Sequence, residues 1–84
     1  MKNEKTSNQQ NETTHVSQYD YVGEFHDNRA SVELNGKFGF IDHTGELVIK
    51  CKFDSVGYFH EGETRVELNR KWGFMDGNGN VTWD

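Results

Sequence analysis

Short segments in which apolar and polar residues alternate occupy most of the chain after residue 18. A period of two places successive side chains on opposite faces and is typical of half-buried β-strands. Turn-forming residues separate these segments, as at Asn35-Gly36, where a tight hairpin turn needs a left-handed backbone that Asn and Gly adopt at little cost. The pattern therefore predicts an all-β domain with strands at residues 30–34, 37–42, 46–50, 64–68, 71–76 and 80–83.

The predicted strands form two tandem copies of one unit. A shift of 34 positions places residues 32–35 on residues 66–69 with full identity, and the match continues through Asp42 and Asp76 without a gap. A repeat of this length usually corresponds to one supersecondary unit that buries its apolar face against its neighbour. We expect unit one at residues 19–50 and unit two at residues 53–84, each a three-stranded antiparallel meander, packed together as a small sheet or barrel.

The length of the first hairpin loop decides which side chains share a face of the sheet. A two-residue loop pairs Leu34 with Lys37 and leaves the apolar side chains of the two strands on opposite faces. A three-residue loop, with Gly36 as a bulge, pairs Glu33 with Lys37 and gathers them on one face. We favour the three-residue loop because it provides one core, made of Val32, Leu34, Phe38 and Phe40 in the first copy and Val66, Leu68, Trp72 and Phe74 in the second.

Composition limits the size and the location of the protein. With 84 residues, 32% of them hydrophobic, the chain can form one small domain. Residues 1–18 are mostly Asn, Gln, Thr and Ser, which predicts a disordered polar tail without an apolar segment that could act as a signal peptide or membrane span. Cys51 is the single cysteine, so no intramolecular disulfide can form, and we expect a cytoplasmic protein.

The charge distribution argues against two classes of partner. The formal net charge is -5, and the two lysines and two glutamates of residues 1–18 cancel, so all the excess acid lies in the repeats. Binding to nucleic acid or to an anionic membrane requires a basic surface that neutralises phosphate. We therefore expect neither nucleic acid nor membrane as a partner.

Few residues suggest chemistry. His26 and His60 stand at equivalent positions beside acidic residues and could form a metal site, but a repeat alone places identical residues in both copies. Cys51 lies between two lysines that could lower its thiol pKa, although a partly buried packing role is more common. No nucleophile, base and acid stand at a known catalytic spacing. We expect no catalytic residue, no metal and no cofactor, and hence no enzyme.

The residues around each hairpin resemble the signature of the WG repeat family, also called KWG. The similarity lies in the run NGKFGFIDHTG at residues 35–45, in the Trp72-Gly73 dipeptide of the second copy, and in residues 59–62, Phe-His-Glu-Gly, which are similar to the Phe-x-Glu-Gly element of the family. The resemblance covers everything after residue 18. It implies a mostly bacterial β-protein whose repeats serve as a protein-interaction surface, and no catalytic residues transfer with the motif.

The chain departs from this family in two respects. Residues 50–52, Lys-Cys-Lys, stand where the family usually has prolines, and only two units are present. Repeat arrays usually need about three units for stability. We therefore expect the sheet to close on itself or the chain to form a homodimer through an edge strand.

Residues that differ between the copies are candidates for partner recognition, because the repeat does not require them. Tyr and Trp are favoured at interface hot spots, and the alternative for the aromatic residues is that they cap the ends of the core. The candidate partner-binding residues are Tyr21, Tyr58, Trp83 and Arg70.

The leading functional hypothesis is a non-catalytic protein-interaction module with a protein partner. The main alternative is a small acidic inhibitor, of the immunity or anti-defence type, that blocks the binding site of an enzyme. Salt dependence separates the two, because charge-driven inhibition weakens steeply with salt and aromatic docking does not. Carbohydrate binding through exposed aromatic residues is a third hypothesis, and it requires export.

Overall fold

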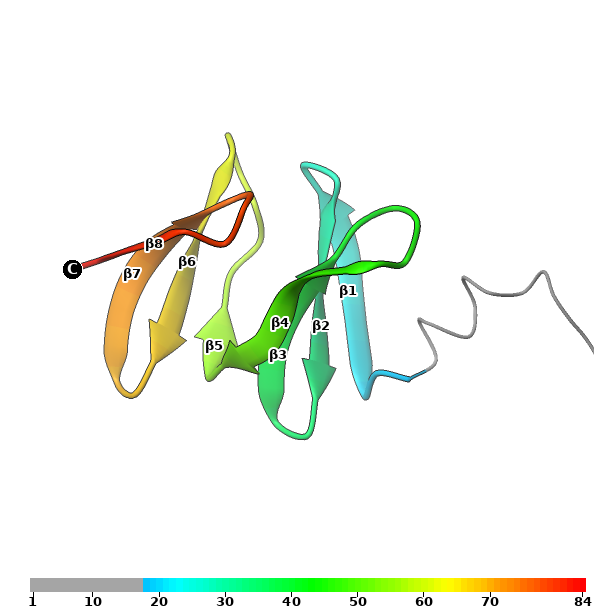
Figure 1. Cartoon of the computed structure of the whole chain (residues 1–84), viewed down its shortest axis with the longest axis horizontal. Helices are drawn as coiled ribbons and strands as arrows, with labels where there is room; N and C mark the ends of the chain where they lie inside the picture. Colours follow the sequence, from blue (N-terminus) through cyan, green and yellow to red (C-terminus); the bar gives the residue numbers. More distant parts are fainter. Residues whose placement is uncertain (1–17) are drawn as a thin grey trace, which may run out of the picture.

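The computed structural model describes residues 18–84, so the predicted tail, apart from Gln18, lies outside the described residues. The described part contains strands and turns and no helix, which confirms the all-β prediction. Figure 1 shows β7 and β8 at one end of the long axis and β1 at the other. The strands are β1 (Tyr21–His26), β2 (Arg29–Leu34), β3 (Lys37–Ile41), β4 (Leu47–Phe53), β5 (Ser55–Val56), β6 (Glu63–Leu68), β7 (Lys71–Asp76) and β8 (Val81–Trp83).

Each repeat is a four-stranded antiparallel meander, one strand more than predicted. The sheet orders are β1-β2-β3-β4, here called unit one, and β5-β6-β7-β8, called unit two. The additional strands are β1 and β5, which pair with their neighbours through Val22 with Val32 and Val56 with Val66. Alternation does not reveal β1 because the register shifts between Val22 and Phe25, and such an irregularity interrupts the period of two. In β5 two residues are too few to show a period.

The hairpin between β2 and β3 has a two-residue loop, so the predicted three-residue loop is wrong. Leu34 pairs with Lys37, and the equivalent residues of unit two pair in the same way. Asn35 and Gly36 have φ angles of 54° and 83°, as a type I′ turn requires. This turn matches the twist of the strands. The three-residue loop would gather the apolar side chains on one face, but unit one buries both faces and does not need this arrangement.

Two apolar clusters cover the two faces of unit one. All nine side chains in them are at most 5% exposed, and removing apolar surface from water stabilises a fold by about 25 cal/mol per Å². The first cluster lies within unit one, and the second joins unit one to unit two, so the two units share a core. The first consists of Ala30, Val32 and Ile41, and the second of Phe40, Ile49, Phe53, Phe59, Val66 and Met75.

The glycine of the Trp-Gly or Phe-Gly signature allows the last strand of each unit to cross closely over the one before. A Cβ atom on Gly39 would lie 2.7 Å from the carbonyl carbon of Lys50 and 2.8 Å from the nitrogen of Cys51. On Gly73 it would lie 2.7 Å from the carbonyl oxygen of Thr82. Real Cβ atoms do not approach backbone so closely. The signature glycine is therefore required by the fold.

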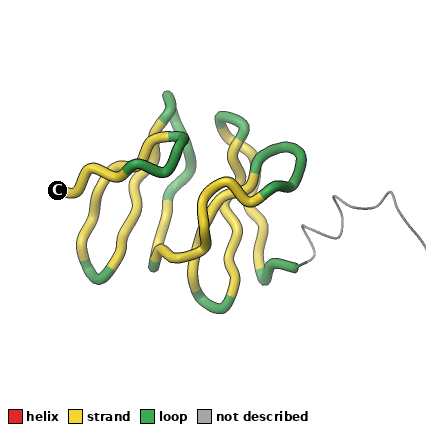
Figure 2. Tube along the Cα trace, in the orientation of Figure 1, coloured by secondary structure: helices red, strands yellow, loops and turns green. Residues whose placement is uncertain are grey.

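Specific contacts fix unit one against unit two. The rings of Phe40 and Phe59 meet edge to face with their centroids 4.8 Å apart. The Lys37 ammonium forms an ion pair with the Asp54 carboxylate. Figure 2 shows that the turns of both units gather at two opposite edges of the molecule. At one of them the backbone N–H of Gly62 donates to the Asp27 carboxylate over 2.9 Å. We call this set of contacts the unit junction.

Candidate protein-docking surface

The sheet face of unit two that points away from unit one is rich in aromatic surface. Arg65 lies opposite Phe74 in the pairing of β6 with β7, and Trp72 lies two residues from Phe74 on the same side, so the three share one face. We call Arg65, Trp72 and Phe74 the outer face. Trp72 and Phe74 are each 39% exposed. Their counterparts in unit one, Phe38 and Phe40, are half-buried and buried respectively, because unit two covers Phe40.

Arg65 organises the outer face. Its guanidinium carbon lies 4.6 Å from the centre of the Phe74 ring and 5.4 Å from the centre of the Trp72 ring. Cation–π contacts at exposed sites contribute about 0.5–1 kcal/mol each. The same guanidinium donates to the Asp84 carboxylate over 3.0 Å, and such an exposed pair adds little stability but orients the group. The outer face therefore combines an ordered cation with two aromatic rings.

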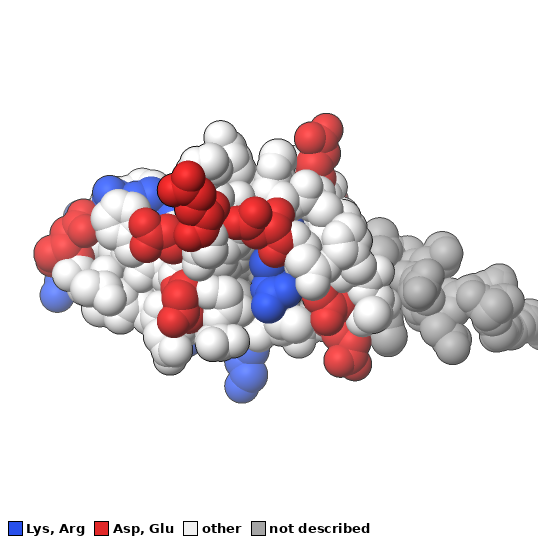
Figure 3. Space-filling model, turned by 90° about the horizontal axis from the view of Figure 1, so that it is seen from above, with Lys and Arg blue, Asp and Glu red and all other residues white. Residues whose placement is uncertain are grey.

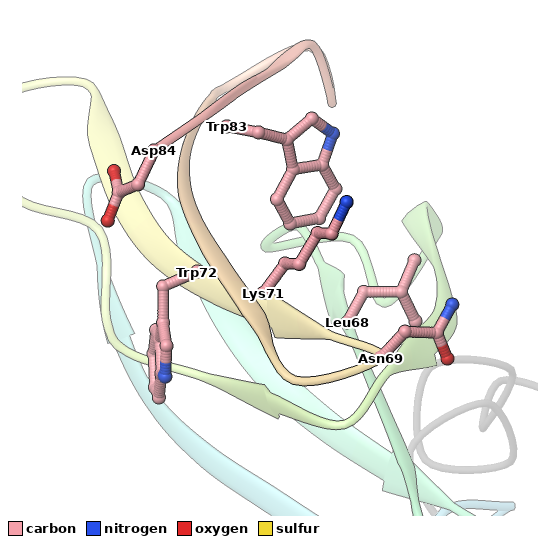
Figure 4. A pocket seen from close by; sticks show the side chains of 6 residues that line it. All are labelled: Leu68, Asn69, Lys71, Trp72, Trp83 and Asp84. Carbon is pink, nitrogen blue, oxygen red and sulfur yellow. The ribbon is translucent and has the colours of Figure 1, made fainter.

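An open hollow of about 780 Å³ lies beside the outer face, at the turn between β6 and β7. Figure 4 shows the Trp83 ring above Lys71 and Leu68, with Trp72 pointing to the opposite side of β7. The strand register explains this, because Trp83 pairs with Gly73, the immediate neighbour of Trp72. Trp83 thus covers the edge of the core of unit two and is still 41% exposed.

A second hollow, of about 430 Å³, lies between the two units. It brings together Tyr21 of unit one and Tyr58 of unit two, which are 54% and 64% exposed. The Tyr58 ring packs on the His26 ring with centroids 4.6 Å apart. Two of the predicted partner-binding residues therefore line one hollow between the units although they are 37 positions apart in sequence.

The other two predicted residues lie elsewhere. Trp83 lines the hollow beside the outer face, and Arg70 is an exposed residue in the adjacent turn, with a positive φ of 69°. The four residues therefore divide between two surfaces, and whether any of them binds a partner stays a prediction.

The prediction that Trp72 and Phe74 belong to the core is wrong. They lie on the face opposite Val66, whereas the core of unit two is built on the Val66 side. Sequence reasoning also did not single out Arg65. Arg65 stands at the repeat position of Ser31, so a charged residue on the face that carries Phe74 was the available signal.

The structure also places the side chains that the sequence suggested for chemistry. Burial raises the pKa of the Cys51 thiol. The two neighbouring lysines would have been expected to lower this pKa, so the shift has the opposite direction. The His60 imidazole lies on the surface, 3.8 Å from the Glu61 carboxylate. Within residues 18–84, no group of three or more His, Cys, Asp or Glu side chains is placed to hold a metal ion.

The repeated meanders and the exposed sheet face define the chain as a tandem β-repeat protein. The WG-containing repeat family matches residues 17–38 and again residues 38–72, well over half of the chain. The chain belongs to this family, and the resemblance found in its sequence is confirmed. No curated protein and no solved structure matches it. In the described part of the chain no helix has the length and apolarity needed to cross a bilayer.

Proposed function

We propose that this protein is a non-catalytic protein-interaction module of the WG-repeat type and that its docking surface is the outer face. The observation that carries the proposal is the exposure of Trp72 and Phe74 on a rigid sheet, beneath the guanidinium of Arg65. Aromatic residues and Arg are enriched at the energetic centres of interfaces. The proposed compartment is the cytoplasm, where the free thiol of Cys51 would remain reduced.

The short turns around the outer face support this role. A tight two-residue loop joins β6 to β7, and an Asx-type turn joins β7 to β8. The aromatic rings therefore lie on a framework that loses little conformational entropy on binding. A rigid surface keeps the entropic cost of binding low.

Acidic inhibition is the second candidate, and the surface charge favours it. Figure 3 shows Asp and Glu side chains along most of the length of one face, with few Lys or Arg between them. A surface of this kind would attract the basic binding site of an enzyme.

A capture experiment at two salt concentrations tests both candidates. The immobilised full chain and its Trp72→Ala, Phe74→Ala and Val48→Ala variants are exposed to a lysate of the source organism, and bound proteins are identified by mass spectrometry. Val48 is also 39% exposed but lies on β4, which makes Val48→Ala the matched control. Circular dichroism confirms that each variant folds.

For an interaction module we expect capture that persists at high salt and falls at least about tenfold in the Trp72→Ala and Phe74→Ala variants, because hot-spot truncations cost 2 kcal/mol or more. The control should retain its partner. Capture that vanishes at high salt and does not depend on either aromatic residue would reject the outer face and favour the inhibitor.

A further inference from the structure

The unit junction shows how one copy of this repeat recognises the next. Phe40 of unit one inserts against Phe59 of unit two, and both rings are buried, at 0% and 2% exposure. Lys37 of unit one pairs with Asp54 of unit two. The side of a unit that carries β3 and β4 therefore fits the side of the following unit that carries its first two strands.

The same two pairs of contact residues recur at opposite ends of the molecule, where no other unit of the described chain covers them and the Phe25 ring stacks on His43 of its own unit with centroids 4.3 Å apart. The counterparts of Phe40 and Lys37, 34 positions later, are Phe74 and Lys71 on β7. The counterparts of Phe59 and Asp54, 34 positions earlier, are Phe25 on β1 and Asp20 just before it. Phe74 and Phe25 are each 39% exposed, and Lys71 and Asp20 are exposed as well. The strands that carry or adjoin them, β7 and β1, lie at opposite ends of the molecule (Figure 1), so each end presents one member of each pair.

The surroundings of these residues are also complementary. At the unit junction, Ser31 and His26 line a hollow to which unit two contributes Tyr58, packed on the His26 ring. Unit two has a corresponding hollow of its own, with Arg65 in place of Ser31 and His60 in place of His26. The residue of unit one that corresponds to Tyr58 is Glu24, which is exposed. Ser31 and Tyr58 are uncharged at the unit junction. Their counterparts are the cation of Arg65 at one end of the molecule and the carboxylate of Glu24 at the other.

We propose that the outer face of one copy docks on the β1–β2 end of a second copy of this chain, with Phe74 against Phe25 and Lys71 paired with Asp20. The contact reuses the Phe–Phe and Lys–Asp pairs of the unit junction, while Val32 and Ile41, the counterparts of Val66 and Met75, stay enclosed in the cluster of unit one. It is heterologous, since the two copies contribute different surfaces, and such contacts build open chains of copies unless a rotation closes them into a ring. The inference rests on the proposed interaction role of the outer face and names its partner.

Purified full-length protein tests this arrangement in analytical ultracentrifugation from micromolar to millimolar concentration. The wild-type chain should show an average mass that rises with concentration past that of a dimer. Phe74→Asp and Phe25→Asp should each weaken self-association at least about tenfold, because each buries a charge in an apolar contact. Val48→Asp, which adds the same charge at an equally exposed position, should associate like the wild type.

Mixing the two variants distinguishes head-to-tail docking from other arrangements. The Phe25→Asp chain keeps an intact outer face and the Phe74→Asp chain keeps an intact β1–β2 end, so an equimolar mixture should form a heterodimer that grows no further. A symmetric dimer through two outer faces predicts the reverse: Phe25→Asp alone would dimerise and the mixture would not form a heterodimer. That result, or a strictly monomeric wild-type chain, would overturn the proposal.

Charge reversal at Lys71 provides a second readout. Lys71→Glu should weaken self-association about two- to fivefold, the range of an exposed ion pair. Lys50→Glu is the control, because Lys50 is an exposed lysine on β4. Equal weakening by both variants would mean that net charge, and not a Lys71–Asp20 pair, controls the association.

The two proposals can fail separately. If purified protein never self-associates but a different protein is captured through Trp72 and Phe74, the interaction role stands and the second copy is rejected as partner. If self-association and capture are both unaffected by substitution of Phe74, the outer face is not a docking surface.

Discussion

At the scale of single residues, glycines and left-handed positions determine how each unit folds. Six non-glycine residues in the described part of the chain have positive φ. Four of them are Asn or Asp, whose side chains tolerate this conformation. Arg70 also has a positive φ, but its side chain does not favour it. Gly39 is required for a different reason, because backbone occupies the space where a Cβ atom would lie.

Gly39→Ala should destabilise the protein by at least about 3 kcal/mol, since a Cβ atom there would overlap the backbone of Lys50 and Cys51, which has no freedom to shift as a side chain does. Urea unfolding measures the loss. Gly57→Ala is the control: its Cβ atom would meet the Thr64 hydroxyl at 3.2 Å, and we expect a cost below about 1 kcal/mol. Equal costs at the two sites would refute the crossing-strand explanation for the signature glycine.

Arg70→Gly should stabilise the protein by about 0.5–1 kcal/mol. An L-residue in the left-handed region costs roughly 1–2 kcal/mol, and the greater freedom of glycine in the unfolded chain offsets part of that gain. Thermal unfolding should show a melting temperature higher by a few degrees. Gly36→Arg is the reverse exchange at the equivalent position of the first copy and should lower the melting temperature. A change of the same sign in both variants would contradict the argument.

At the scale of the strands and their turns, aspartate side chains add hydrogen bonds to those of the turn backbone. The Asp76 carboxylate accepts from the backbone N–H groups of Asn78 and Asn80 at 2.9 and 3.0 Å, and Asp42 does the same for Thr44 and Glu46 in unit one. Asp20 and Asp54 each accept from the backbone N–H of the residue that begins the β2–β3 or β6–β7 turn, Asn35 and Asn69. The repeat thus conserves its turn chemistry along with its apolar pattern.

Acid should weaken these turns. Hydrogen bonds from Asn80 and Asn78 hold the pKa of Asp76 below its ordinary value, and a depressed folded-state pKa contributes stability that is present above the unfolded pKa of about 3.9 and is lost as pH falls through the folded one. Unfolding free energies measured from pH 7 to pH 2 should fall below about pH 4. Asp76→Asn should lower stability at pH 7 and reduce this acid-dependent loss.

Glu46→Gln, which removes an exposed carboxylate, is the control and should leave the acid-dependent loss unchanged. If Asp76→Asn unfolds with the same pH dependence as the wild type, the turn hydrogen bonds do not depend on the charge of Asp76.

At the scale of the whole molecule, the two units are one folding unit, because Phe40 and Phe53 of unit one lie in the same cluster as Val66 and Met75 of unit two. Each unit thereby buries apolar surface against the other. The repeat also explains why the outer face is exposed. Unit two carries the same surface by which unit one binds unit two, and in the described chain no further unit covers it. Partner binding and self-association are both predictions about that surface.

The sequence alone determined the repeat, the β-class, the presence of a hairpin turn at Asn35-Gly36 and the membership of the WG-repeat family, because these depend on local period and local turn chemistry. Only the tertiary structure decided the register, the bulged strand β1 and the exposure of Trp72 and Phe74. Alternation shows that a strand has an apolar face, but it does not show which neighbour covers that face. Phe40 and Phe74 occupy the same repeat position, and only Phe40 has a unit packed against it.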